Sequence, residues 1–377
     1  MADNHTCLEL FALPPDLAAP LPGGGEGDSP RPGCARDKTV ESLTIKASNG
    51  AFPDGALAHK ARISFVEEAV VILALLVIMG GPIAWFVVVL PATLLLGSWT
   101  QLALFAATTV FLSAHPLPKL DYFKLRKSWF VFALYKYFSF RMVTKGNVRE
   151  RAQRVGPWMG AGVPHGVLPF ANILSMLGVN SFSFCGNFVG APASVVFQTP
   201  FLRYLTLLGP TCDVGAKGMV RELDKGHCVG LVPDGIAGIF RCNEEDETIY
   251  LKNRKGLAKL ALKSGYAVVP AYMLGNTAAF SAWFDPFGIM EKVSRKLQAS
   301  LFVYWGRFYL PIPHRTPITM LVGDPVEVPA GIKGGKVENP SQAQIDEMHG
   351  RILAGIKDTF DAHKGACGWG HKVMKFV

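Results

Sequence analysis

The sequence predicts an α/β fold with a mostly parallel sheet, preceded by a transmembrane helical hairpin. Two observations support this fold class. Beyond residue 145, strand-like apolar runs are separated by helical stretches, which is typical of a parallel sheet with crossover helices. Upstream, the segment from Ala69 to Pro118 contains no Asp, Glu, Lys or Arg. Because one span needs roughly 20 apolar residues, this segment is long enough to cross a membrane twice.

The first 58 residues predict a disordered tail. They are rich in Pro, Gly, Asp and Ser and include the run Pro20 to Gly25. A segment of this composition buries too little apolar surface to offset the entropy that it loses on ordering. We therefore assign residues 1–58 to a disordered N-terminal tail.

Residues 59–118 predict the hairpin. Gly80-Gly81-Pro82 and Pro91 are both candidate turn points, and the sequence does not choose between them. Positive residues flank the apolar segment at both ends, which favours a hairpin with both ends on the cytosolic side. The alternative is a buried helical pair in a globular core. The length of the charge-free run favours the membrane hairpin over the buried helical pair.

Residues 119–145 predict an amphipathic helix that lies in the headgroup region. Between Lys124 and Met142, basic residues are interleaved with aromatic ones directly after the apolar segment. The alternative is an ordinary core helix with one solvated face. The position of this segment next to the hairpin favours a helix in the membrane interface over a core helix.

Residues 146–377 are expected to form the catalytic α/β domain. Ser341 is a plausible cap for the closing helix. The expected strands are Cys228–Val232, Ala267–Met273 and Thr316–Val322, and the expected helices are Val196–Leu208, Ala216–Asp224, Gly256–Ser264 and Ser341–Lys364.

Composition narrows the classes of partner. Lys and Arg number 38 against 29 for Asp and Glu, a formal net charge of +9, which suits an anionic membrane surface or a polyphosphate ligand. We expect no nucleic-acid partner, because no nucleic-acid-binding motif is present. The seven cysteines are scattered without a Cys-x-x-Cys pair, so we expect no metal site, no disulfide framework and a reducing compartment. The N-terminus has neither the basic region nor the apolar region of a cleavable secretory signal.

His165 is the strongest single candidate for catalysis. Histidine titrates near neutrality, as a general base for a hydroxyl group requires. The adjacent Gly166 allows close approach of a carbonyl group, and its N–H could help to hold an oxyanion. The alternative is a histidine that satisfies a turn through backbone hydrogen bonds.

A basic helix start forms a second candidate site. Arg254, Lys255, Gly256 and Lys259 combine backbone donors with cations and would suit the phosphates of coenzyme A. The commoner meaning of such a run is a solvated basic face.

Two acidic positions complete the candidate site. Asp234 and Gly235 follow the strand Cys228–Val232, at the edge where α/β sheets bind ligands, although a simple β-turn would read the same way. Glu247 belongs to an acidic loop that is most often solvated, but it could orient a histidine.

Taken in order over roughly residues 60–365, the motifs resemble the acyl-CoA:diacylglycerol acyltransferase type 2 family, which includes monoacylglycerol and wax-ester acyltransferases. The Arg254 to Pro270 run is specific, whereas Pro-His-Gly alone is weak. The motifs that carry the resemblance are Trp129–Val143 after the apolar segment, Pro164-His165-Gly166, Gly186-Asn187-Phe188, Val232-Pro233-Asp234-Gly235, Arg254–Pro270, Gly275-Asn276 and Val322-Gly323-Asp324-Pro325.

The resemblance implies a glycerophosphate-acyltransferase-like core and transfer of a fatty acyl group from acyl-CoA to an acylglycerol hydroxyl, forming triacylglycerol from diacylglycerol. His165 would be the base, Gly166 an oxyanion donor, and Pro164, Asn187 and Gly235 would lie at the substrate, with Arg254 at the coenzyme A end. Acyl-CoA is a co-substrate, and no other cofactor is implied. The expected setting is the endoplasmic reticulum membrane with a cytosolic catalytic domain, and also lipid droplets. A homodimer is among the expected partners.

Two departures from the family pattern bear on the site. The first histidine of the usual His-Pro-His-Gly motif is Val163, and the usual glutamate downstream is Gly238. Either Asp234 or a loop glutamate such as Glu247 substitutes for that glutamate, or the His165 site is weakened. The alternatives are an acyltransferase with another acceptor (monoacylglycerol, lysophospholipid, fatty alcohol or sterol) and a non-catalytic lipid-droplet scaffold.

Overall fold

The computed structural model describes residues 4–13, 44–48, 50–118, 120–178, 188–240, 247–283, 285, 287–297, 302–329 and 335–377. Its centre is an eight-stranded sheet with the order β2-β1-β3-β11-β8-β4-β6-β5. Strands β4, β5, β6 and β8 run parallel, as do β3 and β11, whereas β11 is antiparallel to β8. The predicted α/β class with a mostly parallel sheet is confirmed. The strands are β1 (His5–Glu9), β2 (Ile45–Lys46), β3 (Arg141–Lys145), β4 (Trp158–Val163), β5 (Phe188–Gly190), β6 (Cys228–Leu231), β8 (Ala267–Leu274) and β11 (Thr319–Val322).

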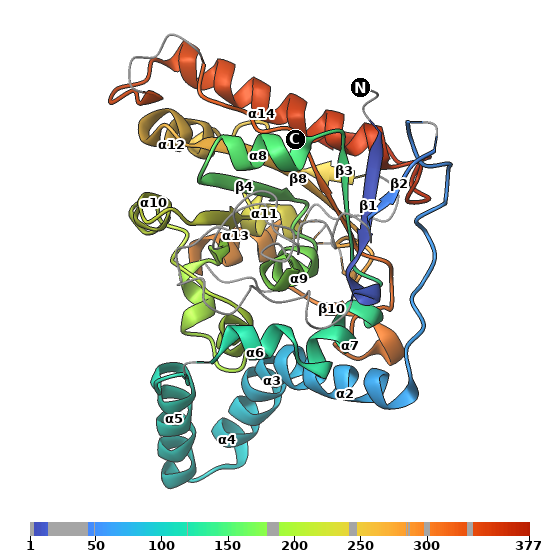
Figure 1. Ribbon diagram of the computed structural model, residues 1–377. Helices are drawn as coiled ribbons and strands as arrows, with labels where there is room; N and C mark the ends of the chain where they lie inside the picture. Colours follow the sequence, from blue (N-terminus) through green and yellow to red (C-terminus); the bar gives the residue numbers. More distant parts are fainter. Residues whose placement is uncertain are drawn as a thin grey trace.

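The sheet is covered on both faces. All eight residues of β8 are buried, and successive side chains enter opposite cores. On one face Tyr272 packs on Phe360 of α14 (Gln342–His363), with ring centroids 4.6 Å apart. On the other face Phe138 packs on Phe170 of α9 (Phe170–Gly178), also at 4.6 Å. In Figure 1, α12 and α14 lie at the upper end, and α7 lies at the lower end.

Several predicted elements are confirmed, including the strands β6, β8 and β11. Ser341 caps α14 through a reciprocal capping box with Gln344. The segment from 196 to 208 is not one helix but two 3₁₀ segments, η5 (Ser194–Phe197) and η6 (Leu202–Leu208). The other elements of the domain are α8 (Val148–Arg154), α10 (Ala216–Asp224), α11 (Gly235–Ile239), β7 (Glu247–Ile249), α12 (Gly256–Ser264), β9 (Ser281–Ala282), α13 (Ile289–Leu297), β10 (Tyr304–Trp305), η7 (Arg307–Tyr309) and β12 (Met374–Phe376).

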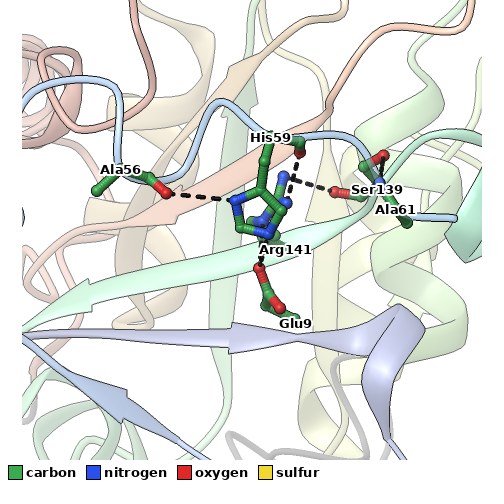
Figure 2. A network of polar contacts seen from close by, with 6 residues as sticks. All are labelled: Glu9, Ala56, His59, Ala61, Ser139 and Arg141. Carbon is green, nitrogen blue, oxygen red and sulfur yellow. Dashed lines mark hydrogen bonds and ion pairs between the residues drawn. The ribbon is translucent and has the colours of Figure 1, made fainter.

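The prediction that residues 1–58 are disordered is wrong where the structure describes them. Strand β1 pairs antiparallel with β3, and η1 (Leu10–Ala12) continues it into the core. Figure 2 shows how Arg141, fully buried on β3, donates to the Glu9 carboxylate at 2.8 Å and to the carbonyls of His59 and Ser139. Removing Glu9 would leave a buried charge without its counter-ion, so this end of the chain is held firmly. Residues 14–43 lie outside the described residues.

The helical hairpin is not confirmed. One helical run, Phe65–Leu96, is long and apolar enough to cross a membrane, whereas α5 (Trp99–Ala114) is shorter. The chain reverses at Gly97, not at Gly80-Gly81-Pro82 or Pro91, which lie inside the run. Each proline follows a π-helical segment (Leu76–Gly80 and Ala84–Val89), where the regular ladder of hydrogen bonds that a proline interrupts is already altered. The run comprises α2 (Phe65–Leu75), η2 (Leu76–Gly80), α3 (Gly81–Ile83), η3 (Ala84–Val89) and α4 (Leu90–Leu96).

Helix α5 packs back on this run. The Trp85 indole donates to the Thr109 hydroxyl at 2.9 Å and stacks on Phe105. Figure 1 shows α4 and α5 projecting from the lower end of the body.

The interfacial helix predicted for 119–145 is also wrong. The segment forms α6 (Tyr122–Arg126), α7 (Trp129–Tyr137) and β3. Most of α7 is buried, and Phe138 and Phe140 after it are fully buried under the sheet. The alternative, a core helix, is correct, because the aromatic residues fill the space between the sheet and α2.

Candidate active site

Three of the four predicted catalytic residues, His165, Gly166 and Asp234, lie where two neighbouring parallel strands end. Pro164-His165-Gly166 follows β4, and Asp234-Gly235 follows β6. Strands β4 and β6 pair directly, so their carboxyl ends meet at one edge of the sheet. The two loops are joined because the His165 backbone N–H donates to Asp234 Oδ2 at 3.0 Å.

The His165 ring is held in one tautomer. Its Nδ1 lies 2.9 Å from the Gly166 carbonyl oxygen, which can only accept a hydrogen bond, so Nδ1 carries the proton. Nε2 is then left with its lone pair. Burial lowers the pKa of His165, and the bond to Gly166 opposes that shift. The ring is therefore neutral at pH 7 and has a basic nitrogen available.

Asn276 holds the His165 turn from behind. Its Nδ2 donates to the Pro164 carbonyl at 2.9 Å, and its Oδ1 accepts from the Ala171 N–H at 2.9 Å. Gly166 has φ +65°, and a Cβ there would lie 2.5 Å from the Asn276 carbonyl oxygen. Only glycine fits so close to another backbone. Asn276 was not predicted as a site residue, although Gly275-Asn276 is one of the motifs that carry the family resemblance and follows the end of β8.

Asp234 contacts the backbone of His165. The residue is fully buried, and burial raises the pKa of its carboxyl to about 7, against opposing hydrogen bonds from backbone N–H groups. Its Oδ1 has no hydrogen-bond partner among the described residues. A Cβ at Gly238 would collide with this carboxylate. The side chain of Asp234 thus occupies the space where a side chain at 238 would start.

Glu247 is buried on β7 and is not a solvated loop residue. Its two carboxylate oxygens accept from the Tyr272 hydroxyl at 2.8 Å and from the Thr277 hydroxyl at 3.1 Å. Thr277 follows Asn276, so Glu247 is linked to the turn that supports His165. The sequence gives no sign of this burial, because Glu247 ends an acidic run of the kind that is usually exposed to solvent.

Of the residues predicted to bind the phosphates of coenzyme A, only Arg254 lies at the cavity with His165. Its guanidinium carbon lies 5.2 Å from the Tyr250 ring centroid, and its Nη1 would lie 3.0 Å from a Cβ at Gly235. Lys255 pairs with Asp346 of α14 at 2.6 Å, and Lys259 is exposed on α12. Gly256 begins α12 and is exposed. Asn187 lies outside the described residues.

A cavity of about 1040 Å³ connects the site to the apolar helices. His165, Gly235 and Arg254 lie at one part of its wall, and Phe86 and Val87 of the helical run lie at another. The remaining lining is mostly apolar, as in pockets for lipophilic ligands. Among the described residues, no group of three or more His, Cys, Asp or Glu side chains could hold a metal ion.

Comparison with known proteins identifies the family of the chain. The family model described as diacylglycerol acyltransferase matches residues 92–374. The chain is 25% identical to diacylglycerol O-acyltransferase 2-like protein 6 of Bos taurus over 263 residues, which are 63% of this chain and 74% of the relative. It is 30% identical to diacylglycerol O-acyltransferase 2 of Danio rerio over 224 residues (54% and 60%), and 28% identical to acyl-CoA wax alcohol acyltransferase 2 of Mus musculus over 185 residues (46% and 54%).

These matches span from about half to three quarters of the length of each relative. The family model covers most of the present chain, including both strand ends that carry the site. The resemblance carried by the motifs around His165 and Arg254 is confirmed: the chain belongs to the diacylglycerol acyltransferase family.

Proposed function

We propose that this protein is a membrane-bound acyltransferase that moves a fatty acyl group from acyl-CoA to the hydroxyl of diacylglycerol, forming triacylglycerol. One observation carries the proposal. The basic Nε2 of His165 belongs to a residue that lines a large apolar cavity, and the same cavity reaches the apolar helices. A lipid hydroxyl and an acyl chain would both find room there.

In the proposed reaction, His165 Nε2 accepts the proton of the acceptor hydroxyl as the oxygen attacks the thioester carbonyl. Backbone N–H groups near Gly166 would stabilise the tetrahedral oxyanion. When the C–S bond breaks, the proton on His165 returns to the departing coenzyme A sulfur. The products are an ester and free coenzyme A, and His165 is again neutral.

The supporting residues have distinct parts in this proposal. Arg254 would meet the phosphates of acyl-CoA through charge-assisted hydrogen bonds, since it alone of the predicted basic cluster lines the cavity. Asp234 would act as a positioning residue, because it contacts the backbone of His165 and does not line the cavity.

The lining favours an uncharged acceptor. Among the described residues of the cavity wall, only Arg254 and His165 can carry a positive charge, and Arg254 is assigned to the donor. A lysophospholipid would bring a phosphate that requires a further cation. Diacylglycerol and a fatty alcohol are both uncharged acceptors, and relatives named for each of them match the chain. We expect the endoplasmic reticulum membrane and lipid droplets as its setting.

The test uses membranes that contain the full chain. Labelled oleoyl-CoA is supplied with diacylglycerol, monoacylglycerol, a fatty alcohol, a sterol or a lysophospholipid. The variant is His165→Ala, and the matched control is His371→Ala, which changes an exposed histidine. We expect labelled triacylglycerol from the wild type and the control, and none from His165→Ala.

Two other results are informative. A different labelled ester that depends on His165 would keep the mechanism and change the acceptor. If no acceptor gives a product that depends on His165, the catalytic proposal fails and the scaffold alternative is favoured.

A further inference from the structure

A short turn at the lower end of the molecule exposes large apolar side chains. In the Arg307–Leu310 turn, Phe308 is 72% exposed, Tyr309 87% and Leu310 44%. Phe308 and Tyr309 also have φ values of 59° and 58°, in the left-handed region that bulky residues avoid. Such backbone strain persists only where the surroundings enforce it, and it gathers at functional positions.

The turn is held rigidly from its base. The Gly306 N–H donates to the Leu310 carbonyl at 2.8 Å, and the Arg307 N–H donates to the Ile312 carbonyl at 2.8 Å. The Arg307 guanidinium forms an ion pair with Glu68 of α2 at 2.5 Å. The backbone hydrogen bonds and the ion pair with α2 fix the base of the turn, so its exposed aromatic side chains are presented outwards from a rigid support.

The turn lies at the same end as the apolar helices. Figure 1 shows the polypeptide around residue 310 beside α2, whereas α14 and both chain ends lie at the opposite end. The start of α2 adds Phe65, which is 86% exposed, and Val66. The Tyr304 hydroxyl donates to the Met79 carbonyl at 3.1 Å, so this face is continuous with the 32-residue apolar run.

Cations lie beside this apolar face, next to the start of α2. Lys60 and Arg62 are exposed just before α2, and Arg315 donates to the Ala61 carbonyl, which brings it to the same place. Aromatic side chains beside basic ones at the edge of an apolar span are typical of residues that lie in the headgroup region. The positive charges complement anionic phospholipids.

We propose that the Arg307–Leu310 turn and the start of α2 together form an anchor that inserts into the interface of an anionic phospholipid bilayer. Phe308, Tyr309 and Phe65 lie at the boundary between headgroups and acyl chains. The anchor sets the height of the body above the bilayer, so that the cavity faces the membrane through the residues of α3 and η3. This assignment concerns lipid contact and does not depend on the proposed chemistry.

The experiment measures lipid contact directly. The full chain, with Cys34, Cys185 and Cys242 changed to Ser, receives Tyr309→Cys, is labelled with an environment-sensitive fluorophore and is reconstituted in phosphatidylcholine–phosphatidylserine nanodiscs. The four other cysteines are buried. The matched control is Val373→Cys, an exposed apolar position near the C-terminus, at the opposite end of the molecule.

We expect brominated phospholipid to quench most of the fluorescence at position 309 and to leave position 373 unchanged. We also expect the emission of the label at 309 in the nanodisc to be shifted to the blue, relative to the same fluorophore on a soluble standard in detergent-free buffer. Equal quenching at both positions, or none at 309, would overturn the proposal. A Phe308→Ser/Tyr309→Ser variant should lose blue-shifted emission at a label on Phe65→Cys; an unchanged spectrum there would equally count against the anchor.

Discussion

Replacing the buried carboxyl of Asp234 by an amide should stabilise the protein at neutral and alkaline pH. In Asp234→Asn the side-chain oxygen can still accept from the His165 N–H, where Oδ2 now lies at 3.0 Å. The amide nitrogen would take the place of Oδ1, which has no partner among the described residues. The shape and the main contact are kept, and only the ability to carry a negative charge is lost.

The magnitude follows from the pKa of Asp234, which burial raises from an ordinary 3.8 to about 7. Between these values the folded state holds a proton that the unfolded state has released. Stability therefore falls as pH rises from 3.8 to 7, and the loss is complete above pH 7. A shift of this size corresponds to about 4 kcal/mol, since each pKa unit is worth about 1.4 kcal/mol. The amide variant escapes this loss.

The assay is thermal unfolding of wild type and Asp234→Asn in detergent at pH 4.5 and pH 8. We expect similar melting temperatures at pH 4.5 and a higher one for the variant at pH 8. His363, whose pKa burial lowers to about 4, changes stability with the opposite sign, but it is present in both proteins and cancels. The control Asp358→Asn alters an exposed carboxylate and should shift neither. A variant that is less stable at pH 8 would refute the reasoning, because it would show that the charge is favourable, through Arg254.

Three further predictions concern activity. Because burial lowers the pKa of His165 from its ordinary 6.5, kcat/KM should fall on the acid side with a midpoint below pH 6.5; a midpoint above that value would contradict a buried neutral base. Arg254→Gln should raise KM for acyl-CoA by about tenfold, as loss of one charge-assisted contact implies, and should leave an acyl-pantetheine without phosphates unaffected. Lys259→Gln should change the KM for neither substrate. An equal rise in the KM for acyl-CoA would show that the wider basic cluster, and not Arg254 alone, binds the phosphates. A Cβ at Gly230, which lines the cavity, would meet the Phe188 ring, so Gly230→Val should lose long-chain before medium-chain acyl-CoA; an unaltered chain preference would remove Gly230 from the acyl path.

Local signals predicted the part of the fold whose physics is local. Helix α14 begins where Ser341 and Gln344 can cap each other, and β8 is recognisable as an unbroken buried run. The prediction for residues 119–145 was wrong because basic and aromatic residues suit a membrane interface and a protein core equally well. Burial of this segment decided the outcome, and it depends on β1, whose Glu9 pairs with Arg141, 132 residues later in the chain. The pairing of β1 with β3 has no local signature.

The site was also predicted only in part, and the position of Asp234 explains why residue 238 departs from the family pattern. Sequence alone singled out His165 and Arg254, which line one cavity in the structure, but it interpreted Gly238 as a missing glutamate and left the substitute for that glutamate open. The carboxylate of Asp234 stands against the Cα of Gly238, where a Cβ would collide with it. An acid at 234 therefore requires glycine at 238, and a glutamate at 238 requires a smaller residue at 234. The two positions are alternatives for one volume, so Asp234→Gly combined with Gly238→Glu should retain more activity than Gly238→Glu alone. Equal losses in the two would show that the positions act independently.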